Sequence, residues 1–292
     1  MVSLLPASVY PRLAALGERY TFGQNGKITI PARSTATSVA GGFVGEGSPI
    51  PVKQAAFTSI SLTPKAVKVI TSFSREIAAH STPNIESVLR TAIQEDTALA
   101  IDSVLLGTGA ASLITPAGLR NGLTPLTPTA GGGFAAAVGD LKGLVGALIT
   151  GSNGALRSPA FLMNPLQVLS LSLTQNAGGD FPFAADLAQG RLQGYPLIQS
   201  TTVPSGTVIV VDAADFVSVT GDVPTFSVSD QATLHMEDTT PLAIGTTGAP
   251  NTVAAPVRSM FQTDSIALRM IMDMNWAMRR TGVAAVVTSV TW

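Results

Sequence analysis

Cysteine, histidine and charge are all scarce in this chain. Its 292 residues include no cysteine and two histidines, and charged residues make up 12% of the sequence. Without cysteine there can be no disulfide framework, thiolate metal site or cysteine nucleophile. The charged share is about half of what is usual for a soluble globular chain. A folded chain with so little charge is expected to cover much of its surface with other protein. We therefore expect a subunit of an assembly.

The charges that are present nearly cancel. Lysine and arginine number 17 against 18 aspartate and glutamate, which gives a net charge of −1. Affinity for phosphate grows with the number of cations that displace counterions, so sequence-specific or bulk nucleic-acid binding is not expected. Glycine, proline, threonine or serine interrupts each apolar stretch before 18 residues, so no membrane span is expected. Residues 1–5 lack signal-peptide features, and we expect synthesis and work in the cytoplasm.

The chemistry of a catalytic or metal site is also missing. A Ser-His-Asp enzyme would need His80 or His235 beside a nucleophile, and no serine stands in a G-x-S-x-G elbow. The two histidines lie too far apart in sequence for a metal-ligand spacing. The glycines of 107–112 close a helix, and 131–134 lacks the lysine of a phosphate loop. We expect no enzymatic activity, no cofactor and no metal.

The first quarter of the chain is predicted to be an arm followed by a long loop. Residues 1–44 are rich in serine, threonine, glycine and proline, with one short strand predicted at 27–31. After the breaker cluster 45–51, apolar residues alternate on both sides of Thr63-Pro64, which indicates a two-stranded hairpin or a long loop. A hairpin with so few apolar residues is not stable alone, so we expect it to lie on a neighbouring subunit.

The clearest helix begins at Ser81-Thr82-Pro83, where a hydroxyl can cap and proline can occupy the first turn. Apolar residues then recur at three-and-four spacing as far as Leu105, and Gly107 and Gly109 end the helix. About 24 residues make a rod of roughly 36 Å. Glu86 and Arg90 form a favourable i, i+4 pair on its polar side.

The second half of the chain alternates short helices and strands, which predicts an α+β domain. We expect a helix over 140–149, a strand over 160–163, a helix capped by Asn164, a strand over 207–211 and one or two strands within 225–237. Longer alternating strands follow in 258–292, and we expect them to pack beneath the long helix.

Six residues are candidates for contacts between subunits. The aromatic Phe57 faces either its own core or a neighbour. The lysines of the same segment either solvate an exposed loop or pair with acids on the helix of an adjacent subunit. Glu95 and Asp96 point about 100° apart on that helix, so they indicate a solvated or salt-bridged face and not a catalytic pair. The set comprises Lys53, Phe57, Lys65, Lys68, Glu95 and Asp96.

The order of these features resembles the major capsid proteins of tailed bacteriophages, which have the Hong Kong 97-type capsid fold. The resemblance covers nearly the whole chain. The motifs that carry it are the helix-end Leu106-Gly107-Thr108-Gly109, then Pro116-Ala117-Gly118-Leu119, Met163-Asn164-Pro165, and the run from Gly190 to Leu197 that contains Gly194-Tyr195-Pro196.

The resemblance implies an α+β subunit with five segments. These are an N-terminal arm (1–44), an extended β-hairpin loop (45–75), a peripheral domain with the spine helix (76–130), an axial domain (131–253) and the C-terminal strands of the peripheral domain (254–292). In the family, axial domains gather around the axes of pentamers and hexamers, and the extended loop lies across the neighbour. The implied product is an icosahedral head in the virion that encloses double-stranded DNA without sequence-specific binding.

The resemblance also implies partners besides other copies of the chain. We expect a portal, a decoration protein in some cases, and a separate scaffolding protein, because the sequence passes from Met1 directly into the arm. Some members join subunits by a lysine–asparagine isopeptide bond. Here the matching loop position falls near Ile50, and the strand around 266–270 offers no asparagine, so no crosslink is expected.

Two other functions remain open on the sequence. One is an encapsulin-like nanocompartment shell, which resembles this family but has an N-terminal helix that binds cargo peptides, a feature that residues 1–40 do not show. The other is a cytoplasmic serine hydrolase using His235.

Overall fold

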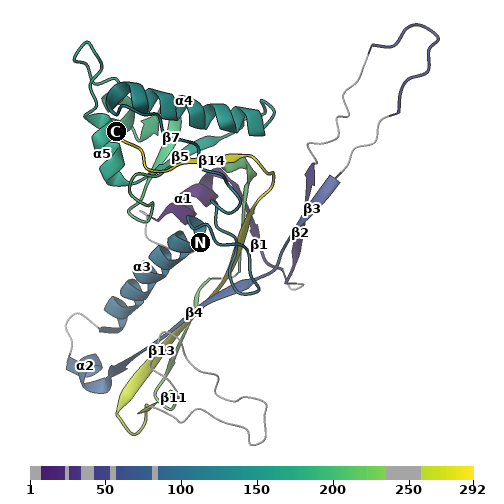
Figure 1. Cartoon of the computed structure of the whole chain (residues 1–292). Helices are drawn as coiled ribbons and strands as arrows, with labels where there is room; N and C mark the ends of the chain where they lie inside the picture. The colour runs from purple at the N-terminus through teal and green to yellow at the C-terminus, as the bar shows by residue number, and fades with distance from the viewer. Residues whose placement is uncertain are drawn as a thin grey trace, which may run out of the picture. The chain divides into compact units, whose positions relative to one another are not determined.

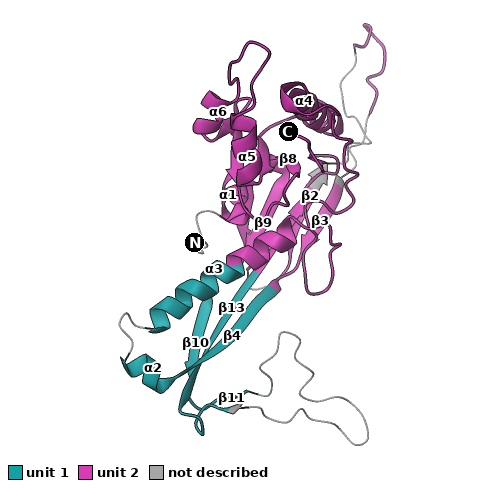
Figure 2. Ribbon diagram, turned by 60° about the vertical axis from the view of Figure 1, so that its left-hand side comes forward, with its two compact units in different colours: residues 1–3, 66–97, 222–273 teal, residues 4–65, 98–221, 274–292 magenta. Residues whose placement is uncertain are grey.

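A computed structural model describes residues 8–23, 26–33, 43–52, 57–80, 85–221, 223–234 and 258–292. Helices and strands are mixed along the chain, as the α+β prediction requires (Figure 1). The described residues fall into two compact units (Figure 2). The first unit holds residues of 66–97 and 222–273, and the second holds residues up to 65 together with 98–221 and 274–292.

The second unit contains a five-stranded sheet with the order β14-β8-β5-β7-β6. Its strands are β14 (Ala284–Val287), β8 (Val208–Asp212), β5 (Pro159–Met163), β7 (Tyr195–Gln199) and β6 (Arg191–Leu192). Strand β5 pairs parallel with β7 and antiparallel with β8, and every residue of β5 and β8 is buried. Such continuous apolar strands are typical of a sheet centre.

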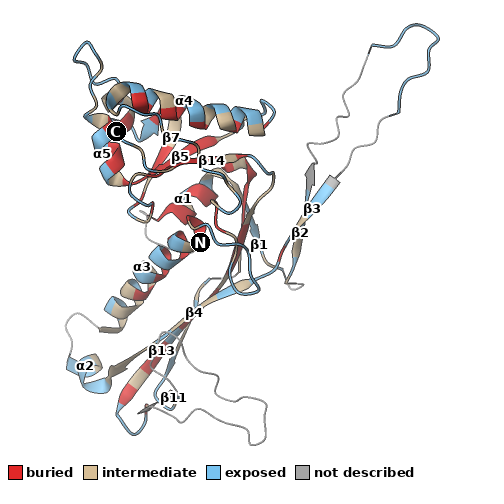
Figure 3. Cartoon of the chain, in the orientation of Figure 1, coloured by how far each residue is buried: buried red, intermediate tan, exposed pale blue. Residues whose placement is uncertain are grey.

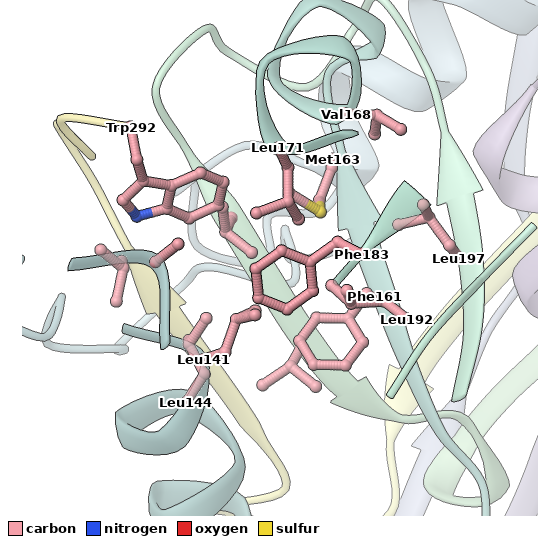
Figure 4. Packing of buried hydrophobic residues seen from close by; sticks show 14 of the residues in the cluster. Leu141, Leu144, Phe161, Met163, Val168, Leu171, Phe183, Leu192, Leu197 and Trp292 are labelled. Atoms are coloured by element: carbon pink, nitrogen blue, oxygen red, sulfur yellow. The ribbon is translucent and has the colours of Figure 1, made fainter. Parts of the chain in front are cut away.

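Three helices belong with this sheet: α4 (Gly133–Gly151), α5 (Pro165–Ser172) and α6 (Ala184–Ala188). The inner face of α4, including Leu141, Leu144 and Leu148, packs into one apolar cluster with Phe161, Phe183 and Trp292 (Figure 4). Asp140 joins this face to the core, because its carboxylate accepts hydrogen bonds from the Thr129 amide at 2.6 Å and from Trp292 Nε1 at 2.8 Å.

The second unit also carries the N-terminal elements. Helix α1 (Val9–Leu16) precedes β1 (Glu18–Thr21), which pairs parallel with β9 (Phe216–Thr220); η1 (Ala213–Asp215) leads into β9. Strand β9 pairs antiparallel with the last residues of β13 (Ser265–Met278). Strands β2 (Ile28–Arg33) and β3 (Phe57–Leu62) form an antiparallel pair whose Ile30 and Leu62 pack on Val217 and Val219 of β9.

The first unit is a helix on a sheet. It contains β4 (Lys65–Ser74) from Ala66 onward, the first part of β13, β10 (Thr225–Ser229), α2 (Arg75–His80) and the first part of α3 (Ile85–Leu105). Leu89 and Ile93 of α3 pack on Leu268 and Met270 of β13. The short pair β11 (Thr233–Leu234) and β12 (Arg258–Ser259) completes the unit.

Several sequence predictions are confirmed. The strands expected at 27–31, 160–163 and 207–211 are β2, β5 and β8 to within about two residues. Asn164 caps α5, since its side-chain oxygen accepts a hydrogen bond from the Leu166 amide at 3.0 Å. Of the C-terminal strands, β13 packs beneath the long helix as expected. That helix ends at Leu105, while its expected start at 81–83 lies outside the described residues.

The predicted two-stranded pairing of the segments 57–62 and 65–73 is wrong. Strand β3 pairs with β2, which comes from the expected arm, and β4 pairs with β13. Both segments alternate polar and apolar residues, so each needs a partner, but alternation does not name the partner. Burial decides it, because Ile60 and Leu62 pack with Ile28 and Ile30, whereas Val69 and Phe73 pack with Leu89 and Ile93.

Three smaller expectations also need correction. The stretch 1–44 was expected to be an extended arm, but it includes α1, whose Val9, Tyr10, Leu13 and Ala14 are buried. The helix expected over 140–149 begins at Gly133. The last strand, β14, does not pack beneath the long helix, because it pairs with β8 and completes the sheet of the second unit. The five segments expected from the resemblance stay a prediction.

Candidate assembly surfaces

The β2–β3 hairpin presents an exposed apolar loop. Residues 43–52 lie between its strands, and every one of them is solvent-exposed. Ile50 and Val52 expose 80% and 98% of their surface, and Phe43 is fully exposed. Glu46 is the one charged residue in 43–52. An exposed apolar loop is unfavourable in a monomer, whereas a partner molecule can bury it. Figure 3 shows these residues in the exposed colour.

The structure places the six predicted contact residues in different environments. Lys65 is half-buried, and its Nζ donates to the Ser112 carbonyl oxygen at 2.5 Å, so it has a partner within its own chain. Lys68 on β4 and Glu95 and Asp96 on α3 are exposed, and they form no ion pair among the described residues. Phe57 pairs through its backbone with Arg33. Lys53 lies outside the described residues.

A buried carboxylate that the sequence did not reveal anchors α1. Asp102 of α3 is fully buried and accepts hydrogen bonds from Ser8 Oγ at 2.9 Å, the Val9 amide at 2.7 Å and the Tyr10 amide at 3.0 Å. It satisfies donors that a helix N-terminus leaves free. Burial raises the pKa of Asp102, and the hydrogen bonds to Val9, Tyr10 and Ser8 oppose that rise. No sequence signal pairs residues so far apart.

The glycine motifs after α3 build a tight connection. A Cβ atom on Gly118 would lie 2.1 Å from the Gly107 carbonyl oxygen, whereas one on Gly109 would meet nothing within 4 Å. The loop is tied down by Trp276 Nε1, which donates to the Ala117 carbonyl oxygen at 2.8 Å. The motifs quoted for the resemblance therefore have a packing role.

Two arginines after β13 form ion pairs, and the acids that Arg280 binds are buried. Arg280 pairs with Asp215 and lies 3.6 Å from Asp212, and both carboxylates are fully buried. The hydrogen bond that Arg280 donates to Asp215 raises the pKa of Arg280. Arg279 pairs with Glu18 of β1. Breaking the pairs of Arg280 leaves a buried charge unpaired, which marks Arg280, Asp212 and Asp215 as structural.

Reactive groups do not gather on the part of the chain that the structure describes. No three histidine, aspartate or glutamate side chains there could hold a metal ion. His80 is exposed at the end of α2, and His235 lies outside the described residues.

Within the described ranges, α4 is long and apolar enough to cross a membrane, although the sequence alone predicted no such segment. Helices in the core of a folded domain meet the same criterion of length and composition, and the inner face of α4 packs in the core cluster.

Solved structures share this fold over nearly the whole chain. A chain from Mycobacterium phage Bobi aligns with a TM-score of 0.70 at 14% identity, covering 94% of this chain and 89% of the other. A chain from Mycobacterium phage Cain aligns with a TM-score of 0.67 at 16% identity, again covering 94% of this chain and 89% of the other. A chain from the capsid of an empty GTA particle, computed with C5 symmetry, aligns at 0.62 and 13% identity, over 95% and 89%. The capsid fold expected from the resemblance is confirmed.

Sequence comparison gives the same result. A capsid polyprotein of Pseudomonas phage PAJU2 is 28% identical over 288 residues, which are 93% of this chain and 41% of that protein. The chain therefore spans about two fifths of the length of this relative. The family model described as the phage capsid family matches residues 7–288. Because that match covers almost every residue, the chain belongs to the phage capsid family.

Proposed function

We propose that this chain is a major capsid protein, which self-assembles as pentamers and hexamers into the icosahedral head that encloses the double-stranded DNA of a tailed phage. Family membership and the capsid fold support the proposal. The observation that carries it is the β2–β3 hairpin with its exposed apolar residues 43–52, a surface that a neighbouring subunit would bury.

The proposed contacts between subunits include charged residues that form no ion pair with any other described residue. Lys68 is exposed on β4, and Glu95 and Asp96 are exposed on α3, so the lysine of one copy can pair with an acid of another. Surface pairs of this kind contribute little energy but fix the register of a contact. Lys53 and Phe57 stay proposed contacts of the same hairpin. Lys65 is a weaker candidate because Ser112 already holds it.

The proposal extends to partners and location. A portal, a separate scaffolding protein and, in some heads, a decoration protein would complete the virion, and assembly would take place in the bacterial cytoplasm. The near-neutral charge suits a wall that must release its DNA. Maturation would rotate subunits as rigid bodies and repack the hairpin.

The test is negative-stain electron microscopy with sedimentation of the chain, alone and with the scaffolding protein of its own genome. We expect closed shells or capsomer-sized rings. Monomers or small dimers under both conditions would reject the proposal.

The nanocompartment alternative needs a helix free to bind cargo. Helix α1 does exist, but its apolar face is buried within its own unit, so this face is not free for a cargo peptide. The hydrolase alternative needs His235: a His235→Ala variant would lose a hydrolase activity, whereas a capsid protein with this change still assembles.

A further inference from the structure

An uncharged groove lies between α5 and α6. Its volume is about 560 Å³, and none of its ten lining residues carries a charge. Leu169 and Leu173 stand on its rim with 56% and 63% of their surface exposed, and Phe181 is also exposed. Scattered exposed leucines need no explanation, but a helical stripe of them beside a groove indicates a surface that another molecule covers.

The outer face of α4 is the second unusual surface of this unit. Its exposed residues recur at three-and-four spacing, while the opposite face is buried (Figure 3). Between the two ends of the helix they are Ala135, Val138, Lys142, Gly143, Gly146 and Ile149, and Gly133 and Thr150 are exposed at the ends.

The glycines on this face are not required by the chain's own packing. A Cβ on Gly146 would meet nothing within 4 Å, and one on Gly143 would meet Leu126 Cδ1 at 4.0 Å. Glycine destabilises a helix relative to alanine, so its presence here favours close approach by another backbone.

The charges around the two surfaces are complementary. Lys142 is the one exposed charged residue of α4, because Asp140 is buried. Beside the groove, Asp186 lies on α6 between the lining residues Ala184 and Leu187, and Asp180 directly precedes the lining residue Phe181. Among the described residues, neither Lys142 nor these two aspartates forms an ion pair. The anions and the cation are therefore available to a second copy.

We propose that the outer face of α4 in one copy packs along the α5–α6 groove of the next copy, with Lys142 facing Asp180 and Asp186. The two surfaces are different, so the contact is head to tail, and within a capsomer the rotation between copies closes it into a ring. This inference rests on the proposed function, since the second copy is a neighbour in the same capsomer.

Crosslinking tests the contact, and the absence of native cysteine makes it clean. Two double variants are assembled with scaffold and treated with a short bis-maleimide: Val138→Cys with Leu169→Cys, and Ile149→Cys with Leu169→Cys. We expect at least one to give a ladder of covalent oligomers that ends at the ring size. The single-cysteine variants and the matched pair Ile149→Cys with Phe261→Cys, whose second site is exposed on the other unit, should give none.

The outcomes separate the two proposals. Particles that form normally while neither double variant crosslinks above its controls would overturn the α4–groove contact and leave the capsid function standing. A wild-type chain that forms no particles with scaffold would reject the function itself. Co-flotation of the free chain with phosphatidylcholine vesicles, abolished by Val138→Asp, would assign the α4 face to a membrane and overturn the contact.

A charge exchange provides an independent test. Lys142→Glu should lower the yield of capsomers about tenfold, as the loss of one good contact does, and adding Asp186→Lys should restore it. A purely structural role of Lys142 cannot be rescued in this way. Gly146→Ala should raise the melting temperature of the free chain and still lower capsomer yield. Unchanged yield in both Lys142→Glu and Gly146→Ala would contradict the contact.

Discussion

At the scale of single residues, a few buried groups hold the fold together, and Asp102 is the clearest. Replacing Asp102 by alanine leaves the Ser8 hydroxyl and two amides of α1 without their acceptor. Each buried donor left unpaired costs about 1–3 kcal/mol. We expect Asp102→Ala to lower the free energy of unfolding by roughly 3 kcal/mol in urea titrations. Asp96→Ala, on the exposed side of the same helix, should change it by less than about 0.5 kcal/mol.

The glycines of the post-α3 loop form a second matched pair. Gly118→Ala places a Cβ atom against the Gly107 backbone, so the loop must shift. We expect this to lower the free energy of unfolding by about 2 kcal/mol or more. Gly109→Ala has open space around it and should be neutral within about 0.5 kcal/mol. Thermal unfolding of both variants checks this, and equal losses would show that close packing is not the reason for Gly118.

Tyr10 gives the fold a dependence on alkaline pH. Its ring packs against Phe216 and Trp276, and burial raises the pKa of Tyr10 to about 12. A folded-state pKa above the unfolded value means that this stabilisation is present below pH ~10 and is lost as the pH rises towards 12. The unfolding free energy of the wild type should fall by about 3 kcal/mol relative to Tyr10→Phe across that window. If the unfolding free energies of the two proteins, measured by denaturant titration at each pH, change with pH in parallel, this assignment is contradicted.

At the scale of elements, the β2–β3 hairpin separates stability from assembly. Its strands pack on β9, whereas residues 43–52 are exposed and none of the described residues covers them. Replacing Phe43, Ile50 and Val52 by serine should leave unfolding of the free chain within about 0.5 kcal/mol of the wild type. The same variant should form few particles in sedimentation, because the apolar contact with a neighbour is lost. Normal particle yield would show that this loop is not a subunit contact.

At the scale of the whole molecule, charge governs the relation to DNA. A net charge of −1 provides no excess of cations for counterion release. We expect the free chain to leave duplex DNA unretarded in gel-shift experiments at ~0.15 M salt and up to ~10 μM protein. Retardation at low micromolar concentration with a steep salt dependence would reveal a basic surface that the composition hides.

Features that depend on composition and on neighbours along the chain could be predicted from the residues alone. Scarce charge pointed to an assembly subunit, absent cysteine excluded disulfides and thiolate sites, and local rules placed the Asn164 cap, the end of α3 and the buried strand β8. These succeed because a cap or an apolar period acts over a few residues. The glycine motifs that carry the resemblance were visible for the same reason.

Which elements contact each other became clear from the three-dimensional structure. The alternation of apolar residues in β3 and β4 shows that each strand needs a partner. It does not show whether β3 pairs with β4, or β3 with β2 and β4 with β13, because the apolar surface of each strand fits several partners. In the sequence, Asp102 is an ordinary polar residue of a helix, and only its hydrogen bonds with α1 in the folded chain show its role. The α5–α6 groove and the bare face of α4 also come from distant segments. Long-range burial selects these pairings, and no local pattern encodes it.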